Sequence, residues 1–433
     1  MGSLTDSTKK IIHWLFGSEK VVKKQSKVPD HLLQEYLDVV YPDVRSKIGL
    51  DLNVPKTSFS ISIFMRSKGA THPYAGKFDI DELYFSGSLV KVAAMFAAHS
   101  LRANARALIK DMVADPSQAA GVTSSATFFT RLEQRLNLAG AVPEITNASG
   151  IAKKPSYDSI LKITGDFNHP ETLAVDFTNT PDGFLPHMRK MIIPSDNCSA
   201  GVCIRRLSYP YINVELMKAG FFSKDTMKGV WLCGDYIADF CPQAVKDLKQ
   251  TYIRLPTIND CKKGASPPQC GSAQDATSKP MALFFLKILT GELVDATSSG
   301  EMLGLLVEAQ AGNDFSFLSK SAGANDSNRA TGNVAKKFTI TGIKIGQGEI
   351  KTDPDRNEGG IAPEVRSEGE ILKWKIAADD TVLRKKFDDL NLTGEFAVCW
   401  QNLSNLTPNT DGIIELLNRT IEGYINQSPP LNA

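Results

Sequence analysis

Ser88 and Lys91 stand three positions apart in "YFSGSLVKVAAMFAAHSLR" (84–102), at the head of an alanine-rich stretch with helical periodicity. This spacing places both side chains on one face of a helix. A serine hydroxyl is a weak nucleophile until a base removes its proton, and a lysine can be that base when burial lowers its pKa. The pair predicts acyl-transfer chemistry, with an alternative in which Ser88 caps the helix and Lys91 is a solvated first-turn residue.

The Ser-x-x-Lys pattern occurs three times in the chain, so context has to choose among the copies. Ser7 lies in a polar terminal segment, and Ser159 lies in "PSYDSILKITGDF", which has no sustained helical pattern behind it. Ser88 opens a long apolar helical stretch, whose first-turn amides can stabilise an oxyanion. We therefore expect Ser88 to be the nucleophile.

A second candidate is the tripeptide Ser195-Asp196-Asn197, between the helical stretches "DGFLPHMRKMI" and "AGVCIRRL". A turn of this kind can direct one hydroxyl and one amide to the same side. It can equally be an ordinary turn and helix cap, because Ser, Asp and Asn are the usual residues in both.

A third candidate lies in the strand-like run "KKFTITGIKIGQ" (336–347), which contains Lys344 and Gly346. A lysine on an edge strand can bind a carboxylate, and a nearby glycine lets a ligand lie close along the strand. The sequence leaves open whether Lys344, or instead Lys336 or Lys337, has this role.

These candidates have to be positioned by three parts of the chain. The parts are an early strand, a long helical region and a late set of strands. The run "TSFSISIFMR" (57–66) alternates as a strand with one buried face does, and helical spacing extends from residue 88 to about 310. Three strand-like runs follow the polar stretch 319–333, and the amphipathic segment "DGIIELLNRTIEGYI" comes last. This order predicts an α/β fold of the α+β kind, with an antiparallel sheet flanked by helices and an inserted all-α domain.

We expect three parts along the chain. They are a helical N-terminal extension (1–50), a sheet domain formed by 51–90 together with 319–433, and a mostly α-helical domain (91–318).

Composition and charge favour a globular protein with a small or neutral partner. The chain has 433 residues, 42% of them hydrophobic, and a net charge of +1. It has no long run of one sign and no apolar stretch of about 18 residues, so we expect neither nucleic-acid binding nor a membrane-spanning segment. We expect a small-molecule or peptide substrate, and no metal or other cofactor, since the six histidines lack metal-ligand spacing. The first residues lack a signal-peptide pattern, which leaves a periplasmic, secreted or cytoplasmic location open. The oligomeric state is open as well.

The seven cysteines are too few and too irregular to predict a disulfide framework. Cys261 and Cys270 flank a loop and could pair, and we expect the others to be reduced. Trp231, Tyr236 and Phe240 have a spacing that favours one face of a helix, in the core rather than at a substrate.

Taken together and in this order, the three candidates resemble the S-x-x-K, S-D-N and K-T-G signature of the bacterial penicillin-recognising serine hydrolases, namely class A β-lactamases and penicillin-binding proteins. "YFSGSLVKVAAM" is similar to the nucleophile helix of that family. The segment "SKPMALFFLKILTGELVDATSSGEMLGLL" (278–306) is similar to the paired helices before its third motif. The resemblance covers roughly residues 57–428 and implies the β-lactamase and transpeptidase fold, with acyl transfer through a serine ester.

The resemblance implies three catalytic residues. Ser88 would be the acylated nucleophile and Lys91 its proton acceptor. Ser195 would pass a proton to the leaving group.

The resemblance also implies four substrate-binding residues. Asn197 would hold an amide group of the substrate, and Lys344 would supply positive charge. Gly346 would permit close approach along the strand, and the amide of Gln347 would join that of Ser88 in an oxyanion hole.

The chain departs from the family pattern at two points. Ile345 replaces the threonine of K-T-G, and the E-x-x-L-N loop that supplies a deacylating glutamate is missing. Glu215 lies in a helical segment, which leaves Asp235 and Asp239 as weak substitutes. Without a carboxylate to activate water an acyl-enzyme should persist, which keeps a second hypothesis open: a non-catalytic or slow penicillin-binding-like receptor that retains the fold.

Overall fold

The structure is a computed structural model. It describes residues 31–48, 60–77, 80, 84–137, 154–223, 226, 228–232, 236, 240–246, 248, 274–312, 336–349, 364–404 and 410–426. These residues belong to two compact units. We call the first the helical unit (the described residues of 90–274 and 291–305) and the second the sheet unit (the described residues of 31–89, 275–290 and 306–426). Each unit is described by itself, and the domain limits expected from the sequence stay a prediction.

The sheet unit is built on a five-stranded antiparallel sheet with the order β2-β1-β11-β10-β9. Its strands are β1 (Ser60–Ser67), β2 (Tyr74–Lys77), β9 (Phe338–Glu349), β10 (Glu364–Trp374) and β11 (Leu392–Ser404). Strands are confirmed within the expected runs 57–66, 336–347 and "GEFAVCWQN" (394–402), whereas the strand expected in "EILKWKIAAD" (370–379) begins earlier and ends at Trp374. The described residues of this unit also include a short antiparallel pair, Tyr84 and Phe85 of β3 (Tyr84–Phe85) with Ala276 and Asp275 of β8 (Gln274–Ala276).

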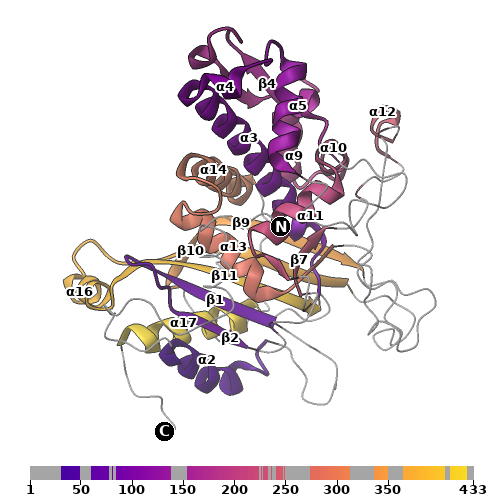
Figure 1. The fold of residues 1–433 in the computed structure, drawn as a ribbon. Helices are drawn as coiled ribbons and strands as arrows, with labels where there is room; N and C mark the ends of the chain where they lie inside the picture. Colours follow the sequence, from indigo (N-terminus) through magenta and orange to yellow (C-terminus); the bar gives the residue numbers. More distant parts are fainter. Residues whose placement is uncertain are drawn as a thin grey trace. The chain divides into compact units, whose positions relative to one another are not determined.

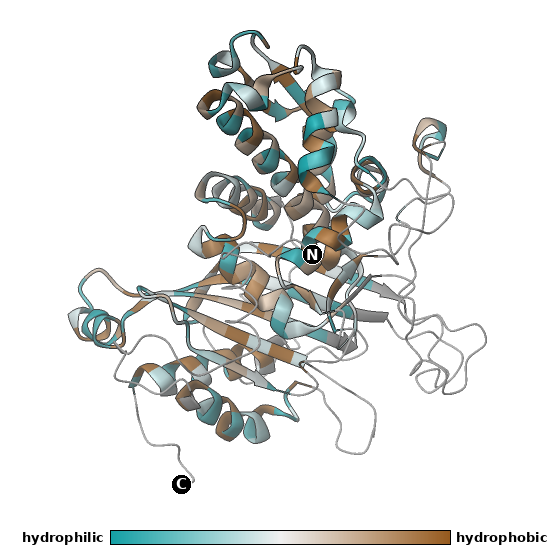
Figure 2. Cartoon of the chain, in the orientation of Figure 1, coloured by the Kyte–Doolittle hydropathy of each residue, from teal (hydrophilic) through white to brown (hydrophobic). Residues whose placement is uncertain are grey.

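Helices lie on the sheet and bury its apolar residues. They are α2 (His31–Val44), α13 (Ser278–Thr290), α16 (Thr381–Asp389) and α17 (Thr410–Asn426). Helix α13 packs on β1, β10 and β11, while α2 packs against α17 and β2 (Figure 1). One core, which includes Leu37, Trp400 and Leu417, joins α2, the sheet and α17. The amphipathic last helix is confirmed, and α2 is part of this core. Figure 2 shows the hydrophobic colour along the central strands.

The helical unit is centred on α3 (Lys91–Ala114), a 24-residue helix. Around it lie α4 (Pro116–Ala119), α5 (Ser125–Leu136), α8 (Tyr157–Ile160), α9 (Phe184–Ile192), α10 (Asn197–Leu207), α11 (Tyr209–Lys218), α12 (Gln243–Lys246) and α14 (Ala296–Gly312), which continues into the sheet unit. The first half of α3 is buried all round, because its alanines allow α9, α10 and α11 to pack closely against it. The apolar stretch behind Ser88 is thus the buried helix that its periodicity predicted.

Two short antiparallel pairs in the helical unit were not expected from the sequence. They are β4 (Leu161–Thr164) with β5 (Ala174–Phe177) and β6 (Phe222–Ser223) with β7 (Lys228–Leu232). The 3-10 turns are η1 (Gly87–Val90) and η2 (Pro170–Thr172). The block is still mostly helical, as predicted.

Two expectations about particular side chains are wrong. Cys198 and Cys241 form a disulfide, although both were expected to be reduced. Trp231 and Tyr236 are buried, as expected, but Trp231 lies in strand β7 rather than in a helix, and Phe240 is 76% exposed rather than in the core. Residues of β7 after the first are buried without alternation, and a short buried strand of this kind cannot be told from a helix segment by spacing.

Several calls lie outside the described residues. These are Ser7 with Lys10, Asp235, Asp239, the polar stretch 319–333 and the Cys261–Cys270 pair. Of the helices described, none is long and apolar enough to cross a membrane.

Candidate active site

Ser88 lies in the 3-10 turn η1, immediately before α3. The N-cap position of α3 belongs to Val90, so Ser88 is not the capping residue that the alternative required. Gly87 precedes Ser88 with φ of 50°, a left-handed conformation that favours glycine. The serine is half-buried.

The backbone around Ser88 packs directly against β9 at Gly346. A Cβ atom on Gly346 would lie 1.6 Å from the carbonyl oxygen of Ser86 and 2.8 Å from the amide nitrogen of Leu89. This position has no room for any side chain. Gly346 therefore has a structural role in the close approach of two backbones, in addition to the substrate role that the sequence predicted.

Gln347 lies on the other side of the same contact. A Cβ atom on Gly87 would lie 2.8 Å from the Gln347 amide nitrogen and 2.9 Å from its carbonyl oxygen. The residue before the candidate nucleophile is thus in contact with the backbone of the residue expected to share its oxyanion hole. Both are in the sheet unit.

Gln401 on β11 holds the segment before Ser88 in place. Its amide Nε2 donates to the Ser86 hydroxyl at 2.7 Å and to the Ala276 carbonyl at 3.1 Å, and all three residues are buried. The Ser86 hydroxyl in turn donates to the Tyr84 carbonyl at 3.0 Å. This network was missed from the sequence, because nothing in the pattern "CWQN" marks its glutamine as a partner of Ser86.

The three candidate lysines of the third motif lie at different ends of β9. Lys344 is buried, two positions before Gly346, and its Nζ donates to the Ile345 carbonyl at 3.3 Å. Lys336 and Lys337 precede the strand. Lys337 is separated from Lys344 by about 23 Å along the chain at the usual rise per residue, and Lys336 is one residue further away. Lys337 Nζ donates to Glu422 on α17 at 2.5 Å, and the carbonyl of Lys336 accepts from Lys375. Lys344 is therefore the candidate beside the Ser88 segment.

Lys91 is completely buried at the start of α3, so it is not a solvated first-turn residue. Burial lowers the pKa of its amine from 10.5 to about 7, and the Asp196 carboxylate acts in the opposite direction. No carboxylate among the described residues forms an ion pair with it. An amine in this setting is neutral in a large fraction of molecules near pH 7, which a general base requires.

The Ser195-Asp196-Asn197 turn supplies the polar partners of Lys91. Lys91 Nζ donates to the Ser195 carbonyl at 2.6 Å and to Asn197 Oδ1 at 2.7 Å, and it lies 3.3 Å from Ser195 Oγ. Lys91, Ser195 and Asn197, predicted as site residues from distant segments, thus lie together within the helical unit.

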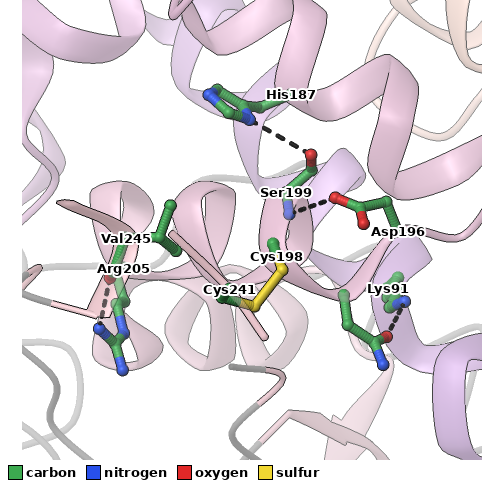
Figure 3. Close-up of a disulfide and its surroundings, with 9 residues drawn as sticks. Lys91, His187, Asp196, Cys198, Ser199, Arg205, Cys241 and Val245 are labelled. Carbon is green, nitrogen blue, oxygen red and sulfur yellow. Dashed lines mark hydrogen bonds between the residues drawn. A yellow bond between two sulfur atoms is a disulfide. The ribbon is translucent and has the colours of Figure 1, made fainter. Parts of the chain in front are cut away.

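The turn itself has an uncommon backbone that its neighbours stabilise. Ser195 has φ of 60°, a conformation that residues other than glycine adopt rarely. The contact of Lys91 with its carbonyl holds it there, as does a bond from the Asp196 amide to the Lys190 carbonyl at 2.9 Å. The Asp196 carboxylate caps α10 by accepting from the Ser199 amide at 2.7 Å (Figure 3). The alternative of a helix cap is therefore correct for Asp196, while Ser195 and Asn197 contact Lys91.

Tyr236 is a site residue that the sequence prediction missed. Its buried ring lies over Lys91, with Nζ 4.9 Å from the ring centroid. Burial raises the pKa of its phenol, so the side chain is neutral. Its spacing from Trp231 and Phe240 suggested a core position, and no local signal pairs a single tyrosine with a lysine so distant in the sequence.

Other residues considered from the sequence do not join this group. Glu215 is in α11, as expected, and bonds to Ser100 and Lys218. Ser159 lies in the four-residue helix α8 and Lys162 in β4, so this third Ser-x-x-Lys copy does not open a long helix. His187 connects α9 to Ser199 on α10, which agrees with a helix-packing role. Over the part of the chain that the structure describes, no group of three or more His, Cys, Asp or Glu is placed to hold a metal ion.

No protein-family model and no curated protein sequence matches the chain. Among solved structures it is similar to class A β-lactamases. One from Bacteroides cellulosilyticus is 9% identical with a TM-score of 0.42, over 90% of this chain and 99% of that one. The β-lactamase from Streptomyces albus G is 10% identical with a TM-score of 0.39, over 90% of this chain and 98% of that one. A β-lactamase from Xanthomonas campestris is 12% identical with a TM-score of 0.40, over 90% of this chain and 97% of that one.

These structural neighbours are of the family that the three sequence motifs resemble. The described elements are of the expected α+β class, with an antiparallel sheet and helices packed on it. At these TM-scores the likeness carries no argument about chemistry, which depends on this chain's own residues.

Proposed function

We propose that the protein is a serine hydrolase that transfers an acyl group from an amide or ester substrate to Ser88. The observation that carries the proposal is Lys91, a buried amine with a pKa of about 7, bound by Ser195 and Asn197 and with no carboxylate partner in the described residues. A structural lysine gains little from such a position, because burial penalises its charge. A general base needs this position.

In the proposed reaction, neutral Lys91 takes the proton of the Ser88 hydroxyl as the serine oxygen attacks the substrate carbonyl. Ser195 then passes a proton to the leaving group, which departs as an amine or alcohol. The acyl group remains on Ser88 as an ester.

The backbone contact between the Ser88 segment and β9 supports an oxyanion hole in the proposed enzyme. The amides of Ser88 and Gln347 would donate to the carbonyl oxygen as it gains charge, and rigid donors of this kind supply much of the rate in acyl transfer. Lys344 would contribute positive charge, and Asn197 would accept or donate to an amide group of the substrate.

Release of the acyl group is the step with the least support. Among the described residues no carboxylate forms an ion pair with Lys91, and the Asp196 carboxylate, which acts on its pKa, is bonded to the Ser199 amide as a helix cap. Ile345 has no hydroxyl to bind a substrate carboxylate. We therefore expect the acyl-enzyme to form faster than it hydrolyses. This behaviour is closer to that of penicillin-binding proteins than to that of efficient β-lactamases.

The proposal is tested by mass spectrometry after incubation with a fluorophosphonate and, separately, with a fluorescent penicillin. We expect one adduct, on the peptide that contains Ser88, and no adduct in Ser88→Ala. The matched control is Ser159→Ala, which removes the serine of another Ser-x-x-Lys copy and should label as the parent does.

A second measurement separates the enzyme from the receptor hypothesis. We expect p-nitrophenyl acetate hydrolysis to fall at least about 100-fold in Ser88→Ala. Equal rates in the two proteins, together with labelling by neither probe, would reject the enzyme and favour a binding protein.

A further inference from the structure

The Tyr236 ring takes a place beside Lys91 that hydrogen-bond acceptors do not fill. Lys91 Nζ donates hydrogen bonds to three oxygens, two of Ser195 and one of Asn197. The centroid of the Tyr236 ring lies 4.9 Å from the same nitrogen. The negative face of an aromatic ring attracts a cation within about 6 Å. The ring also keeps water from the ammonium, because both side chains are buried.

The attraction of the ring and the exclusion of water both affect the pKa of Lys91, and so does the charge of the Asp196 carboxylate. Burial lowers the pKa of Lys91, and the Asp196 carboxylate raises it. Tyr209 is the titratable neighbour of Tyr236, and burial keeps the Tyr236 phenol neutral. A ring in this place limits how far burial can lower the pKa, since it stabilises the ammonium without adding a charge.

Tyr236 lies in the sequence between two points at which the chain is attached within the helical unit. Before it, Leu232 at the end of β7 is bonded to Asn213 on α11, which donates to the Leu232 carbonyl at 2.9 Å and accepts from its amide at 3.0 Å. After it, Cys241 is joined to Cys198 on α10 by a disulfide. Cys198 directly follows Asn197, so the disulfide joins Cys241 to the turn that binds Lys91.

A third attachment lies further along α10. Arg205 Nη1 donates to the carbonyls of Val245, Lys246 and Leu248 at 2.9, 3.1 and 2.5 Å. Figure 3 shows the disulfide from Cys198 to Cys241 and the hydrogen bond from Arg205 to Val245. Residues 241, 245, 246 and 248 are thus attached to α10 near its two ends.

We propose that Tyr236 is a positioning residue for Lys91, and that the Cys198–Cys241 disulfide keeps its ring over the Lys91 amine. The ring sets the protonation equilibrium and the direction of the amine without touching substrate. The proposal deepens the proposed function, in which Lys91 is the base.

The first test measures the pKa of Lys91 directly, by NMR titration of protein labelled with ¹³C at the lysine ε carbon. The Lys91 signal is assigned by its loss in Lys91→Met. We expect Tyr236→Leu, which keeps an apolar side chain and removes the ring, to lower this pKa by about one unit. Tyr236→Phe keeps the ring and should stay within about 0.3 units of the parent. An unchanged pKa in Tyr236→Leu, or an equal shift in Tyr236→Phe, would overturn the positioning role.

The second test measures the part played by the disulfide with a double-mutant cycle. Tyr236→Leu is compared in the parent and in the Cys198→Ala/Cys241→Ala background. We expect its effect on the Lys91 pKa to shrink to less than half in the second background, because the ring is no longer held. An equal shift in both backgrounds would remove the disulfide from the proposal.

These measurements need no substrate, so they are independent of the proposed reaction. If neither probe labels Ser88 but Tyr236→Leu shifts the pKa, the reaction is rejected and the positioning role stands. If Ser88 is labelled and the pKa does not move, only the positioning role fails. Folding of each variant is checked by thermal unfolding, and Tyr236→Met, a second ringless variant, should repeat the Tyr236→Leu result and replaces it if that protein does not fold.

Discussion

The surroundings of Ser88 and of Lys91 are built in different ways, although the two residues are near neighbours in the chain. The backbone before and after Ser88 lies against the backbone of β9, and two glycines, Gly87 and Gly346, allow this contact. Lys91 lies among side chains and a turn, and its properties depend on burial, one carboxylate and one ring. The arrangement around Ser88 depends on close backbone packing, which leaves no room for an added atom. The arrangement around Lys91 depends on electrostatics, so its charge changes with pH.

The largest effect on stability is expected at Gly346, where there is no room for a side chain. Gly346→Ala places a methyl group at 1.6 Å from the Ser86 carbonyl oxygen, a backbone atom that cannot swing away. We expect a loss of about 3 kcal/mol or more in the free energy of unfolding, measured in urea, and loss of probe labelling at Ser88. Gly304→Ala on α14, which meets nothing within 4 Å, is the control and should be neutral or stabilising by up to about 1 kcal/mol. Normal labelling and stability of Gly346→Ala would show that the two segments do not need their close contact.

A smaller effect for each step of one pH unit is expected from titration of Lys91. The pKa of Lys91 falls from 10.5 to about 7 on folding, so between these values the unfolded chain binds a proton that the folded protein does not. The free energy of unfolding should therefore rise with pH in this window, by up to about 1.4 kcal/mol per pH unit relative to Lys91→Met. Below pH 7 both states are protonated and the difference should be constant.

The rate of acylation should follow the same group. If neutral Lys91 is the base, the rate of fluorophosphonate labelling should rise through about pH 7 and then level off. Lys162→Met, at an exposed lysine, is the control for Lys91→Met and should leave both profiles unchanged. A parent and a Lys91→Met protein with parallel stability curves would contradict the lowered pKa.

The smallest effect is expected from the single charge beside Lys91. Asp196→Asn keeps a good N-cap for α10 and removes the carboxylate that raises the Lys91 pKa. We expect the midpoint of the labelling profile to move to lower pH by less than about one unit. Asp295→Asn is a matched control, because Asp295 also accepts from a helix amide, that of Ser298, at 2.7 Å. A shift of equal size in that variant would mean that the effect is one of capping rather than of charge.

Much of the fold could be predicted from periodicity. Strand β1, strand β11 and the helices α3 and α17 follow patterns of two or of three and four residues that persist over a whole element. The short pairs β4–β5 and β6–β7 could not be predicted, because strands of two to five residues are too short to establish a period.

The candidate site was predictable only where residues are near neighbours or belong to an ordered motif. Lys91 with Ser195 and Asn197 is an example, since the order of motifs brought them into one hypothesis. Tyr236 and the Cys198–Cys241 disulfide, which spans 43 residues, depend on how segments pack. The same holds for Gly346, whose need for space is set by a carbonyl of Ser86 in a distant segment.

The pairing of β1 with β11 has a consequence for biosynthesis. Ser60 is paired with Gln401, so β1 has to wait for some 340 residues of further translation, roughly 20–70 s, before its partner exists. The helical unit is encoded almost entirely within that interval, so it can fold while β1 has only β2 as a partner strand. During that time Ile61 and Ile63 are exposed on a strand without its central neighbour, which is a site for aggregation. A chain that ends before residue 392 would stay in this state.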